Sequence, residues 1–342
     1  MIILGIETSC DETAAAVIKA NEHDDKKVKL LSNVVATSLL LHAQTGGIIP
    51  EVAAREQVKF ILPVIDEALK VLGNPKREID AIAVTIGPGL IGSLLVGVET
   101  ARTFAYVWNK PLIPVNHLFG HIYANWIKSE NDNEIEFPAI ALIVSGGHTD
   151  LVLMKNHNDI KWLGGTRDDA AGEAFDKTGR LLNLDYPAGP LIEKLAMGVE
   201  KDVYHFPRPI IDSGDFDFSF SGLKTAVLRE VQKQKNLSED DVKNLCFSLQ
   251  QAIFDVLTKK TFAAADRYNV KSIVLGGGVT ANQTLRKRFG QEIENRKSDA
   301  KLFIPERKLC TDNGAMIAAV AFFNNQRIDW HKISANPELY FN

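Results

Sequence analysis

The chain has 342 residues, of which 45% are hydrophobic and 24% charged, and this composition excludes a disordered or fibrous protein. It carries 39 Lys and Arg against 43 Asp and Glu, a net charge of −4, which argues against a generic polycationic nucleic-acid binder. The three cysteines, Cys10, Cys246 and Cys310, lie far apart and predict no disulfide framework, as in a protein of the reducing cytosol.

An apolar strand, a small polar turn and a second strand are predicted at the N-terminus. Residues 2–7 (IILGIE) have the composition of a buried strand, and residues 13–19 return as another. The chain has no basic lead and reaches an acid too early for a signal peptide. The turn between the strands either closes through local turn chemistry or handles a polar substrate near a phosphate. Its candidate side chains are Ser9, Asp11 and Glu12.

An uncharged run between Asp80 and Glu99 approaches the length of a membrane span. Its proline and clustered glycines divide it into a strand (81–86), a loop and a helix (93–108), which disfavours a span. The loop, GPGLIG, matches the G-x-G-x-x-G pattern of dinucleotide-binding proteins. That class also needs an acid at the end of the next strand, but residues 111–115 run into Asn116, so we expect no dinucleotide site.

Two histidines at positions i and i+4, His117 and His121, follow this strand. On a helix they share one face, about one turn apart, where both can bind one metal ion. A stacked structural pair is the alternative. A zinc protease would need Glu directly after the first histidine, and Leu118 stands there. Two histidines leave a metal short of ligands, so a carboxylate from elsewhere in the chain is required.

The pattern of strand, turn and strand occurs a second time in the chain. Residues 139–145 (AIALIVS) and 150–155 are the strands, and a further strand, 272–275, enters a glycine-rich loop and a helix that begins near Asn282. Two such hairpin units, each followed by helices, indicate an α/β protein with two related lobes around a cleft. Polar segments at 21–27 and 128–133 are predicted to be a hairpin loop and a linker. Helical periodicity covers 51–72, 93–108, 172–183, 188–198, 221–235, 239–267 and 312–324.

Three turns of small or polar residues, 8–12, 146–149 and 276–278, each follow an apolar strand. Such residues either close a tight turn or expose backbone N–H groups that bind phosphate oxygens. Because three of them occur in one chain, we favour the binding of one nucleotide. No Gly-Lys-Ser/Thr triplet occurs, which excludes a P-loop NTPase.

Four acids lie within nine positions of the segment 168–176. Asp169, Glu173 and Asp176 are predicted to share one helical face, where like charges destabilise the helix unless something binds them. The segment is either a solvated helix start, which the helix dipole favours, or a site that hydrogen-bonds a ribose or another hydroxyl-bearing ligand.

Asp312, at the start of the last apolar helical segment, is the best candidate for the missing metal ligand. Its alternative role is the N-cap of that helix. We expect the helix to pack back on the first lobe.

A set of motifs in one fixed order resembles a known protein family from Gly5 to about Ala335. The motifs are GIETSCDETAAAV, GPGLIGSLLVG, HLFGH, IVSGGHTDLVL, DDAAGEAFDKTGRLL followed by LDYPAGP, FSFSGLKTAV, GGGVTAN and CTDNGAMIA. The chain resembles the TsaD family (also called Gcp or YgjD) of tRNA N6-adenosine threonylcarbamoyltransferases. SCDET in the first turn resembles the bacterial members.

The resemblance implies the two-lobed actin-like ATPase (ASKHA) fold of sugar kinases and Hsp70. In this fold an RNase H-like unit is duplicated and the ligand lies in the cleft between the lobes. We expect the first lobe to comprise residues 1–116, joined by 306–342, and the second lobe to comprise 117–305.

The resemblance also implies roles for individual residues. His117, His121 and Asp312 would hold a divalent metal, Fe²⁺ or Zn²⁺, and Ser9, Asp11 and Glu12 would lie near the reacting group. Ala188 departs from the Gly that relatives commonly have, with little expected effect. The substrate would bind at Ile143, Val144, Ser145, Gly146 and Gly147 through its phosphate, at Asp176 and Gly189 through its ribose, and at Asn282 through the nucleotide.

The implied reaction transfers the threonylcarbamoyl group of threonylcarbamoyl-AMP to N6 of adenosine 37 in tRNAs that read codons beginning with A. The implied setting is the cytoplasm, with TsaB and TsaE as partner proteins and no membrane. Candidate tRNA contacts are the basic stretches 224–235, 286–288 and 296–297. The alternatives are a small-molecule kinase of the same fold and a metalloprotease (the O-sialoglycoprotein endopeptidase label), against which Leu118 argues.

Overall fold

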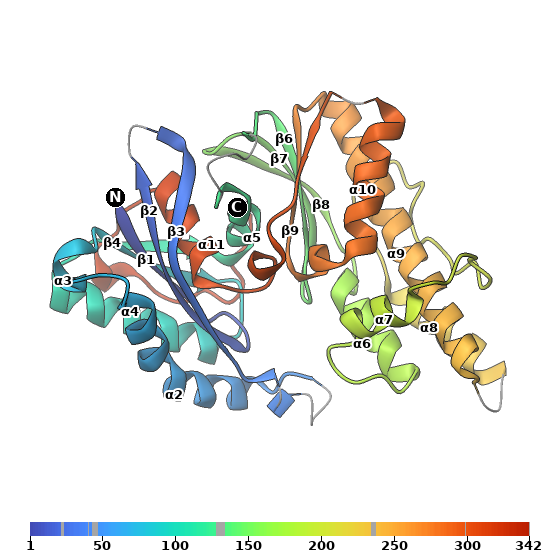
Figure 1. The fold of residues 1–342 in the computed structure, drawn as a ribbon, viewed down its shortest axis with the longest axis horizontal. Helices are drawn as coiled ribbons and strands as arrows, with labels where there is room; N and C mark the ends of the chain where they lie inside the picture. Colours follow the sequence, from blue (N-terminus) through green and yellow to red (C-terminus); the bar gives the residue numbers. More distant parts are fainter. Residues whose placement is uncertain are drawn as a thin grey trace. The chain divides into compact units, whose positions relative to one another are not determined.

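The computed structural model describes residues 1–21, 24–39, 41–42, 47–127, 134–233, 237–297 and 299–341. Two compact units make up the chain: unit 1 is Met1–Glu134 with Pro305–Asn342, and unit 2 is Ile135–Ile304 (Figure 1). The expected lobe boundary at residue 116 precedes α5 (His117–Tyr123), whereas the structure places α5 in unit 1, because it packs against α11 (Gly314–Phe323). The expected linker at 128–133 and part of the expected loop, 22–23, lie outside the described residues.

Unit 1 is built on a five-stranded sheet in the order β3-β2-β1-β4-β5. The predicted hairpin is present, with β1 antiparallel to β2, and β4 and β5 add to it in parallel. The sequence pattern does not predict β3, because this edge strand mixes charged residues with apolar ones that are only half-buried. The strands are β1 (Ile2–Glu7), β2 (Glu12–Asn21), β3 (Asp24–Thr37), β4 (Ala81–Gly87) and β5 (Leu112–Asn116).

Different helices cover the two faces of this sheet. Successive residues of β1 point to opposite faces and therefore contact different helices. Leu4 and Ile6 belong to the apolar core formed with α2 (Pro50–Leu69) and α4 (Ile91–Trp108). Gly5, between them, faces α11, where an added Cβ would lie 2.2 Å from the Gly314 carbonyl oxygen. α11 contacts all five strands, so the prediction that the C-terminal helix packs on the first lobe is confirmed. The short helices of unit 1 are α3 (Pro75–Glu78), η1 (Ala124–Trp126), η3 (Arg307–Leu309) and η4 (Trp330–Lys332).

Unit 2 repeats the plan of unit 1 with the sheet order β10-β9-β6-β7-β8. Its central strand β6 pairs antiparallel with β7 and parallel with β9, as β1 pairs with β2 and β4. The duplicated hairpin that the sequence predicts is thereby confirmed. The strands are β6 (Ala139–Val144), β7 (Thr149–Asn156), β8 (Asp159–Gly165), β9 (Ser272–Gly276) and β10 (Lys301–Phe303).

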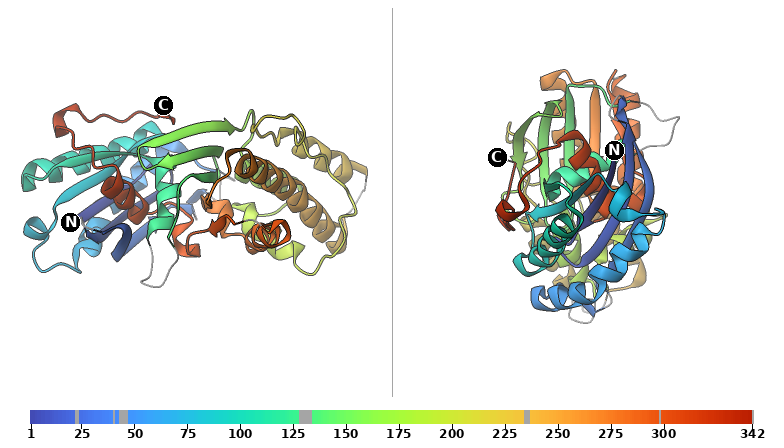
Figure 2. Two further views of the ribbon diagram at one scale, coloured as in Figure 1. Left: turned by 90° about the horizontal axis from the view of Figure 1, so that it is seen from above. Right: turned by 90° about the vertical axis from the view of Figure 1, so that its left-hand side faces the viewer.

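The long helix α9 (Glu239–Tyr268) organises the core of unit 2. A capping box starts it, in which Ser238 and Asp241 satisfy each other's backbone N–H groups. Its buried side chains pack against α7, β6 and α10, and α10 lies beside it in Figures 1 and 2. Within the described ranges no helix, α9 included, is long and apolar enough to cross a membrane. The other helices are α6 (Ala171–Leu181), α7 (Ala188–Ala196), α8 (Ser221–Lys233), η2 (Gly278–Ala281) and α10 (Gln283–Arg296).

The acidic segment before and within α6 finds its partners inside unit 2. Lys177 pairs with Asp169 at 2.5 Å and with Glu173 at 2.9 Å, which relieves their repulsion without a ligand. The prediction that Asp169 shares a helical face with Glu173 and Asp176 is wrong, because α6 begins only at Ala171. Asp168 caps α8 from outside: its carboxylate accepts the N–H groups of Phe220 at 2.8 Å and Ser221 at 3.1 Å.

Replacing Asp168 by Ala is expected to lower the free energy of unfolding by about 2 kcal/mol, because the first turn of α8 loses a charged acceptor. Burial opposes ionisation, but hydrogen bonds from Ser219, Phe220 and Ser221 outweigh it and hold the pKa of Asp168 below its ordinary 3.8. The contribution is therefore present above that pH and is lost as the pH falls through the lowered pKa. Urea unfolding of wild type and Asp168→Ala at neutral and acid pH measures both.

The matched control is Glu173→Ala, which removes an acid of the same segment with an i, i+4 pair to Lys177. It is expected to cost about 0.5 kcal/mol or less. Equal stability of Asp168→Ala and wild type at neutral pH would contradict the capping role.

Candidate metal and substrate site

α5 begins where β5 ends and carries both predicted histidines. Asn116 starts the helix, since its side-chain oxygen accepts the Leu118 N–H at 2.8 Å. The His117 and His121 rings lie one turn apart, with centroids 4.7 Å apart and planes inclined by 77°. The two residues are 6% and 1% exposed, because α5 packs against β4, β5 and α11. Both imidazoles therefore occupy one buried helix face.

Asp312 reaches these histidines from the segment before α11. Its Oδ1 lies 3.6 Å from His117 Nε2 and 3.4 Å from His121 Nε2. The alternative role of Asp312 as an N-cap is wrong, because Asn313 is the cap and its side chain accepts the Met316 N–H at 3.0 Å. The carboxylate of Asp312 is therefore not used by the helix.

The donor set of these three residues fits a transition metal. One ligand atom from each residue lies within 4.8 Å of the others. Two ligand atoms bound at about 2.1 Å to a tetrahedral ion stand about 3.4 Å apart, close to the observed separations from Asp312 to the two imidazoles. Two imidazole nitrogens and one carboxylate suit zinc or non-haem iron and do not distinguish between them.

Glu7, which the sequence analysis does not single out, holds His117 from behind. Its Oε2 lies 3.0 Å from His117 Nδ1 and accepts the Thr85 hydroxyl at 2.6 Å, and Glu7 is wholly buried. We assign the Nδ1 proton to the bond with Glu7, which leaves Nε2 facing Asp312 as a ligand. The available signal was a lone acid at the end of an otherwise apolar strand.

Burial and the neighbouring charges shift the pKa values of His117 and Asp312 in this cluster. Burial alone would lower the pKa of His117, but the negative charges of Glu7 and Asp312 outweigh it and raise the pKa to about 9. Burial, with repulsion from Glu7 and Asp11, raises the pKa of Asp312 to about 6 against the attraction of His117. The carboxylates therefore favour positive charge at this position, either a proton on His117 Nε2 or a cation that displaces it.

The turn 8–12 lies at the same site. The Ser9 hydroxyl is 3.1 Å from His117 Nδ1, and both Ser9 and Asp11 are buried. Burial, followed by the charges of Asp312 and Asp11, raises the pKa of Glu12 well above its ordinary value. The structure therefore brings Ser9, Asp11 and Glu12 together with the metal set inside unit 1.

The predicted phosphate turn in unit 2 follows β6, whose last residues are Ile143 and Val144. Ser145 closes the turn, because its hydroxyl accepts the His148 N–H at 3.1 Å. Gly146 and Gly147 are exposed, and an added Cβ on either would meet no atom within 4 Å. The turn therefore presents open backbone at the end of a buried strand, a geometry suited to an anion.

Asp176 and Gly189 meet at the start of α7. The Asp176 carboxylate accepts the Ala188 N–H at 2.8 Å, and burial raises the pKa of Asp176. An added Cβ on Gly189 would meet no atom within 4 Å. Ala188 is buried against Gly179, so its methyl group turns away from this open space.

Asn282 is the N-cap of α10, and two residues that the sequence analysis missed hold the start of this helix. Its oxygen accepts the Thr284 and Leu285 N–H groups, and its amide donates to Gln250 Oε1 at 2.9 Å. Glu193, one turn after Gly189 on α7, accepts the Gln283 N–H at 2.6 Å. Nothing in the spacing of the motifs indicates Gln250 or Glu193, since their contacts are long-range.

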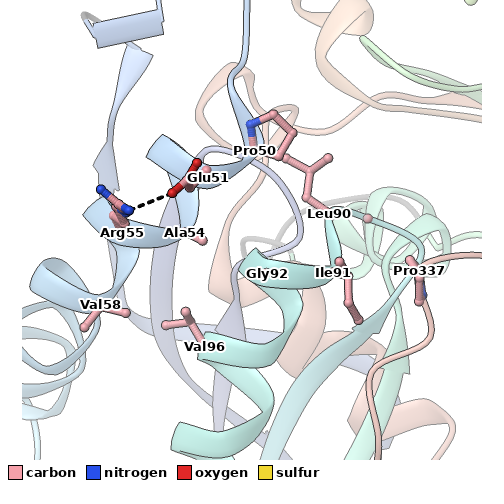
Figure 3. A pocket seen from close by; sticks show the side chains of 11 residues that line it. Pro50, Glu51, Ala54, Arg55, Val58, Leu90, Ile91, Gly92, Val96 and Pro337 are labelled. Carbon is pink, nitrogen blue, oxygen red and sulfur yellow. Dashed lines mark hydrogen bonds and ion pairs between the residues drawn. The ribbon is translucent and has the colours of Figure 1, made fainter.

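A groove of about 650 Å³ lies between α2 and α4 in unit 1 (Figure 3). Its walls are largely apolar, and an ion pair between Glu51 and Arg55 lies at its side. None of the predicted site residues lines it.

Relatives of known name match almost the whole chain. The family model described as tRNA N6-adenosine threonylcarbamoyltransferase (TsaD) matches residues 29–319. A protein of that name from Listeria welshimeri is 48% identical over 342 residues, with 99% of this chain and 96% of the relative covered. Another, from Syntrophomonas wolfei, is 46% identical, with 98% and 96% covered.

Solved structures share the fold at low identity. HypF of T. kodakarensis aligns with a TM-score of 0.59 at 15% identity, over 94% of this chain and 47% of that one. An activator of 2-hydroxyisocaproyl-CoA dehydratase from Clostridium difficile aligns with a TM-score of 0.51 at 13% identity, over 95% of each chain. The expected actin-like ATPase fold is confirmed.

Proposed function

The chain belongs to the TsaD family of tRNA N6-adenosine threonylcarbamoyltransferases, and on that premise we propose which of its residues carry out the transfer. The chain attaches the threonylcarbamoyl group to N6 of an adenosine in tRNA. These relatives do not favour a kinase or a metalloprotease. The proposed acceptor is adenosine 37 of tRNAs that read codons beginning with A, and the proposed donor is threonylcarbamoyl-AMP.

The chemistry of this donor and acceptor sets two tasks for the protein. The donor is a mixed anhydride, so AMP is a good leaving group. The exocyclic amine is a poor nucleophile, because its lone pair is delocalised into the adenine ring. The residues must therefore align the two reactants and stabilise the charge that develops on the carbonyl and phosphate oxygens.

The observation that carries the proposed site is the convergence of His117, His121 and Asp312 in unit 1. These residues would hold Fe²⁺ or Zn²⁺, and the ion when bound would supply a Lewis acid. Glu7 keeps His117 in the tautomer that can bind the ion.

The turn 8–12 supplies the polar groups nearest this set. The raised pKa of Glu12 favours its protonated form, which donates a hydrogen bond. Asp11 and Glu12 are the two candidates to accept the amine proton. Ser9, beside His117 Nδ1, orients the imidazole.

Unit 2 binds the nucleotide in this proposal. The backbone of Ser145, Gly146 and Gly147 receives the phosphate, which the exposed and unobstructed positions of Gly146 and Gly147 support. Asp176 and Gly189 receive the ribose. Asn282 contributes from the capped start of α10, where Gln250 fixes its amide.

TsaB and TsaE are the proposed partner proteins, and the cytoplasm is the proposed setting. The basic stretches predicted to contact tRNA are partly neutralised within unit 2. Arg288 pairs with Asp255, and Arg296 pairs with Asp266 at 2.7 Å and Glu292 at 2.5 Å. Tight capture of tRNA therefore requires surfaces that this chain does not supply alone.

The isolated chain is expected to bind unmodified tRNA with a Kd on the order of 10⁻⁴ to 10⁻⁶ M at physiological salt, the range of non-specific binding. Its net charge of −4 and its paired arginines are the reason. Binding measured with and without TsaB and TsaE, beside transfer of the labelled threonylcarbamoyl group from supplied threonylcarbamoyl-AMP to the same tRNA, tests the proposal. Nanomolar binding by the chain alone would contradict the expectation, and absence of transfer by the full set would contradict the function.

A further inference from the structure

The turn 8–12 is anchored through its backbone carbonyl groups. Ser9 O accepts the Leu90 N–H at 2.8 Å, at the start of α4. Asp11 O accepts the Ser38 hydroxyl at 2.9 Å. The three remaining carbonyl groups, those of Thr8, Cys10 and Glu12, converge on a single side chain.

That side chain is Gln57, in the middle of α2. Its Nε2 lies 3.3 Å from Thr8 O, 3.0 Å from Cys10 O and 2.9 Å from Glu12 O. The residue is 1% exposed. One amide thus contacts every second carbonyl of the turn.

The orientation of this amide is set by its surroundings. Three carbonyl oxygens around one atom require a donor there, so the nitrogen faces the turn. The amide oxygen consequently faces inward and has no hydrogen-bond partner among the described residues. Burying an unsatisfied acceptor is unfavourable, so the contacts of the nitrogen with the turn must offset that cost.

Among the described residues, α4 supplies a second hydrogen-bond donor to Cys10 O. Ser93 Oγ donates to that carbonyl at 3.0 Å, and Thr8 Oγ1 returns a bond to Ser93 O at 2.9 Å. Neighbouring residues of α2 and α4 line the groove of Figure 3, with Val58 next to Gln57 in the sequence and Gly92 next to Ser93. The turn is thus clamped by two helices that pack on each other.

We propose that Gln57 is a positioning residue for the transfer reaction, because its amide fixes the backbone from which Ser9, Asp11 and Glu12 project. The inference rests on the proposed catalytic role of this turn. With all five carbonyl groups held on the side of α2, α4 and Ser38, the Ser9 hydroxyl stays within 3.1 Å of His117 Nδ1. Without the amide, the carbonyl groups of Thr8, Cys10 and Glu12 lose the Gln57 donor, although Cys10 O keeps Ser93, and the turn is expected to move to find others.

Gln57→Leu keeps the size of the side chain and removes the donor. We expect its turnover number to fall at least about tenfold, since sub-ångström displacement of reacting groups is costly, while KM for tRNA changes less than about twofold. Bound metal, measured by elemental analysis, should stay at the wild-type level, because no ligand contacts Gln57. A rise in KM for tRNA with an unchanged turnover number, or loss of the bound metal, would overturn the positioning role.

Gln57→Glu adds a readout that a merely structural residue would not move. The carboxyl group can donate to the turn only when it is protonated, so turnover relative to Gln57→Leu should rise as the pH is lowered from mildly alkaline to mildly acidic. A ratio that falls with decreasing pH would contradict the inference. If Gln57→Leu does not fold, the pH dependence of Gln57→Glu relative to wild type decides the matter in the same way.

The matched control is Ser32→Ala, which removes another hydrogen bond between the sheet and α2. The Ser32 hydroxyl donates to Ala68 O at 2.6 Å, at the far end of the helix from the turn. Ser32→Ala should lower the melting temperature and leave the turnover number unchanged at temperatures below it. The double variant Asp11→Ala/Glu12→Ala separates the role of the turn from that of Gln57: full turnover of the double variant overturns the role of the acids of the turn. Loss of turnover in the double variant, with wild-type turnover in Gln57→Leu, overturns only the inference about Gln57.

Discussion

Replacement of His117 or His121 by Ala is expected to remove most bound metal and to lower transfer activity by roughly two orders of magnitude or more. A Lewis acid that contributes several kcal/mol to the transition state accounts for such a factor, at about 1.4 kcal/mol for each tenfold. The apolar cores of both units should persist, since both side chains face Asp312 rather than the sheet interior. Elemental analysis of the purified variants, with activity measured on unmodified tRNA plus partner proteins, decides the outcome.

Two sets of control variants separate the loss of bound metal from a loss of folding stability. His331→Ala removes an exposed histidine of unit 1 that pairs only locally with Asp329 at 2.7 Å, and it should keep both metal and activity. Asp312→Asn should weaken metal binding without loss of the helix cap, whereas Asn313→Ala should cost about 1 kcal/mol of stability and keep the metal set. Stoichiometric metal in both histidine variants would place the metal elsewhere. Metal loss with full activity would remove its catalytic role.

Replacement of Gly5 by Val is expected to lower the free energy of unfolding by about 3 kcal/mol and to prevent assembly of the metal site. An added Cβ at Gly5 would lie 2.2 Å from Gly314 O and 2.7 Å from the Ala318 nitrogen, and both are backbone atoms that cannot rotate away. α11 must therefore move off β1, and Asp312 must move with it. Thermal unfolding, followed by metal analysis of any soluble protein, measures the effect.

Gly290→Ala is the matched glycine control. Gly290 lies inside α10, where an added Cβ would meet no atom within 4 Å. The substitution should raise stability by up to about 1 kcal/mol through helix propensity. Wild-type stability of Gly5→Val would show that α11 does not depend on this close approach.

The hairpin units and long helices are predictable because their apolar residues form either runs typical of buried strands or a helical period. β1, β2, β6 and β7 are continuous apolar runs beside small turns, and α9 has a long helical stripe. β3, β8 and β10 are not predicted, because edge strands need only one buried face and carry many charges. Their existence depends on a neighbouring strand rather than on their own composition.

The metal set could be proposed from sequence because the spacing of His117 and His121 is local and Asp312 belongs to a recognisable motif. Gln57 could not, and the only signal for Glu7 was a lone acid at the end of an apolar strand. Each resembles an ordinary polar residue at a strand end or on a helix, and each acquires its role from partners far along the chain. The N-cap of α11 was misplaced by one residue for a related reason: Asp312 and Asn313 are equally good caps in sequence, and only the fold distinguishes them.

Nucleoside analysis of tRNA from cells depleted of this protein tests the central claim most directly. We expect threonylcarbamoyladenosine to disappear, to return when the wild-type chain is supplied, and to stay absent when His121→Ala is supplied at equal abundance. Persistence of the nucleoside at its normal level, in depleted cells that hold no second copy of the enzyme, would contradict the assigned transferase activity.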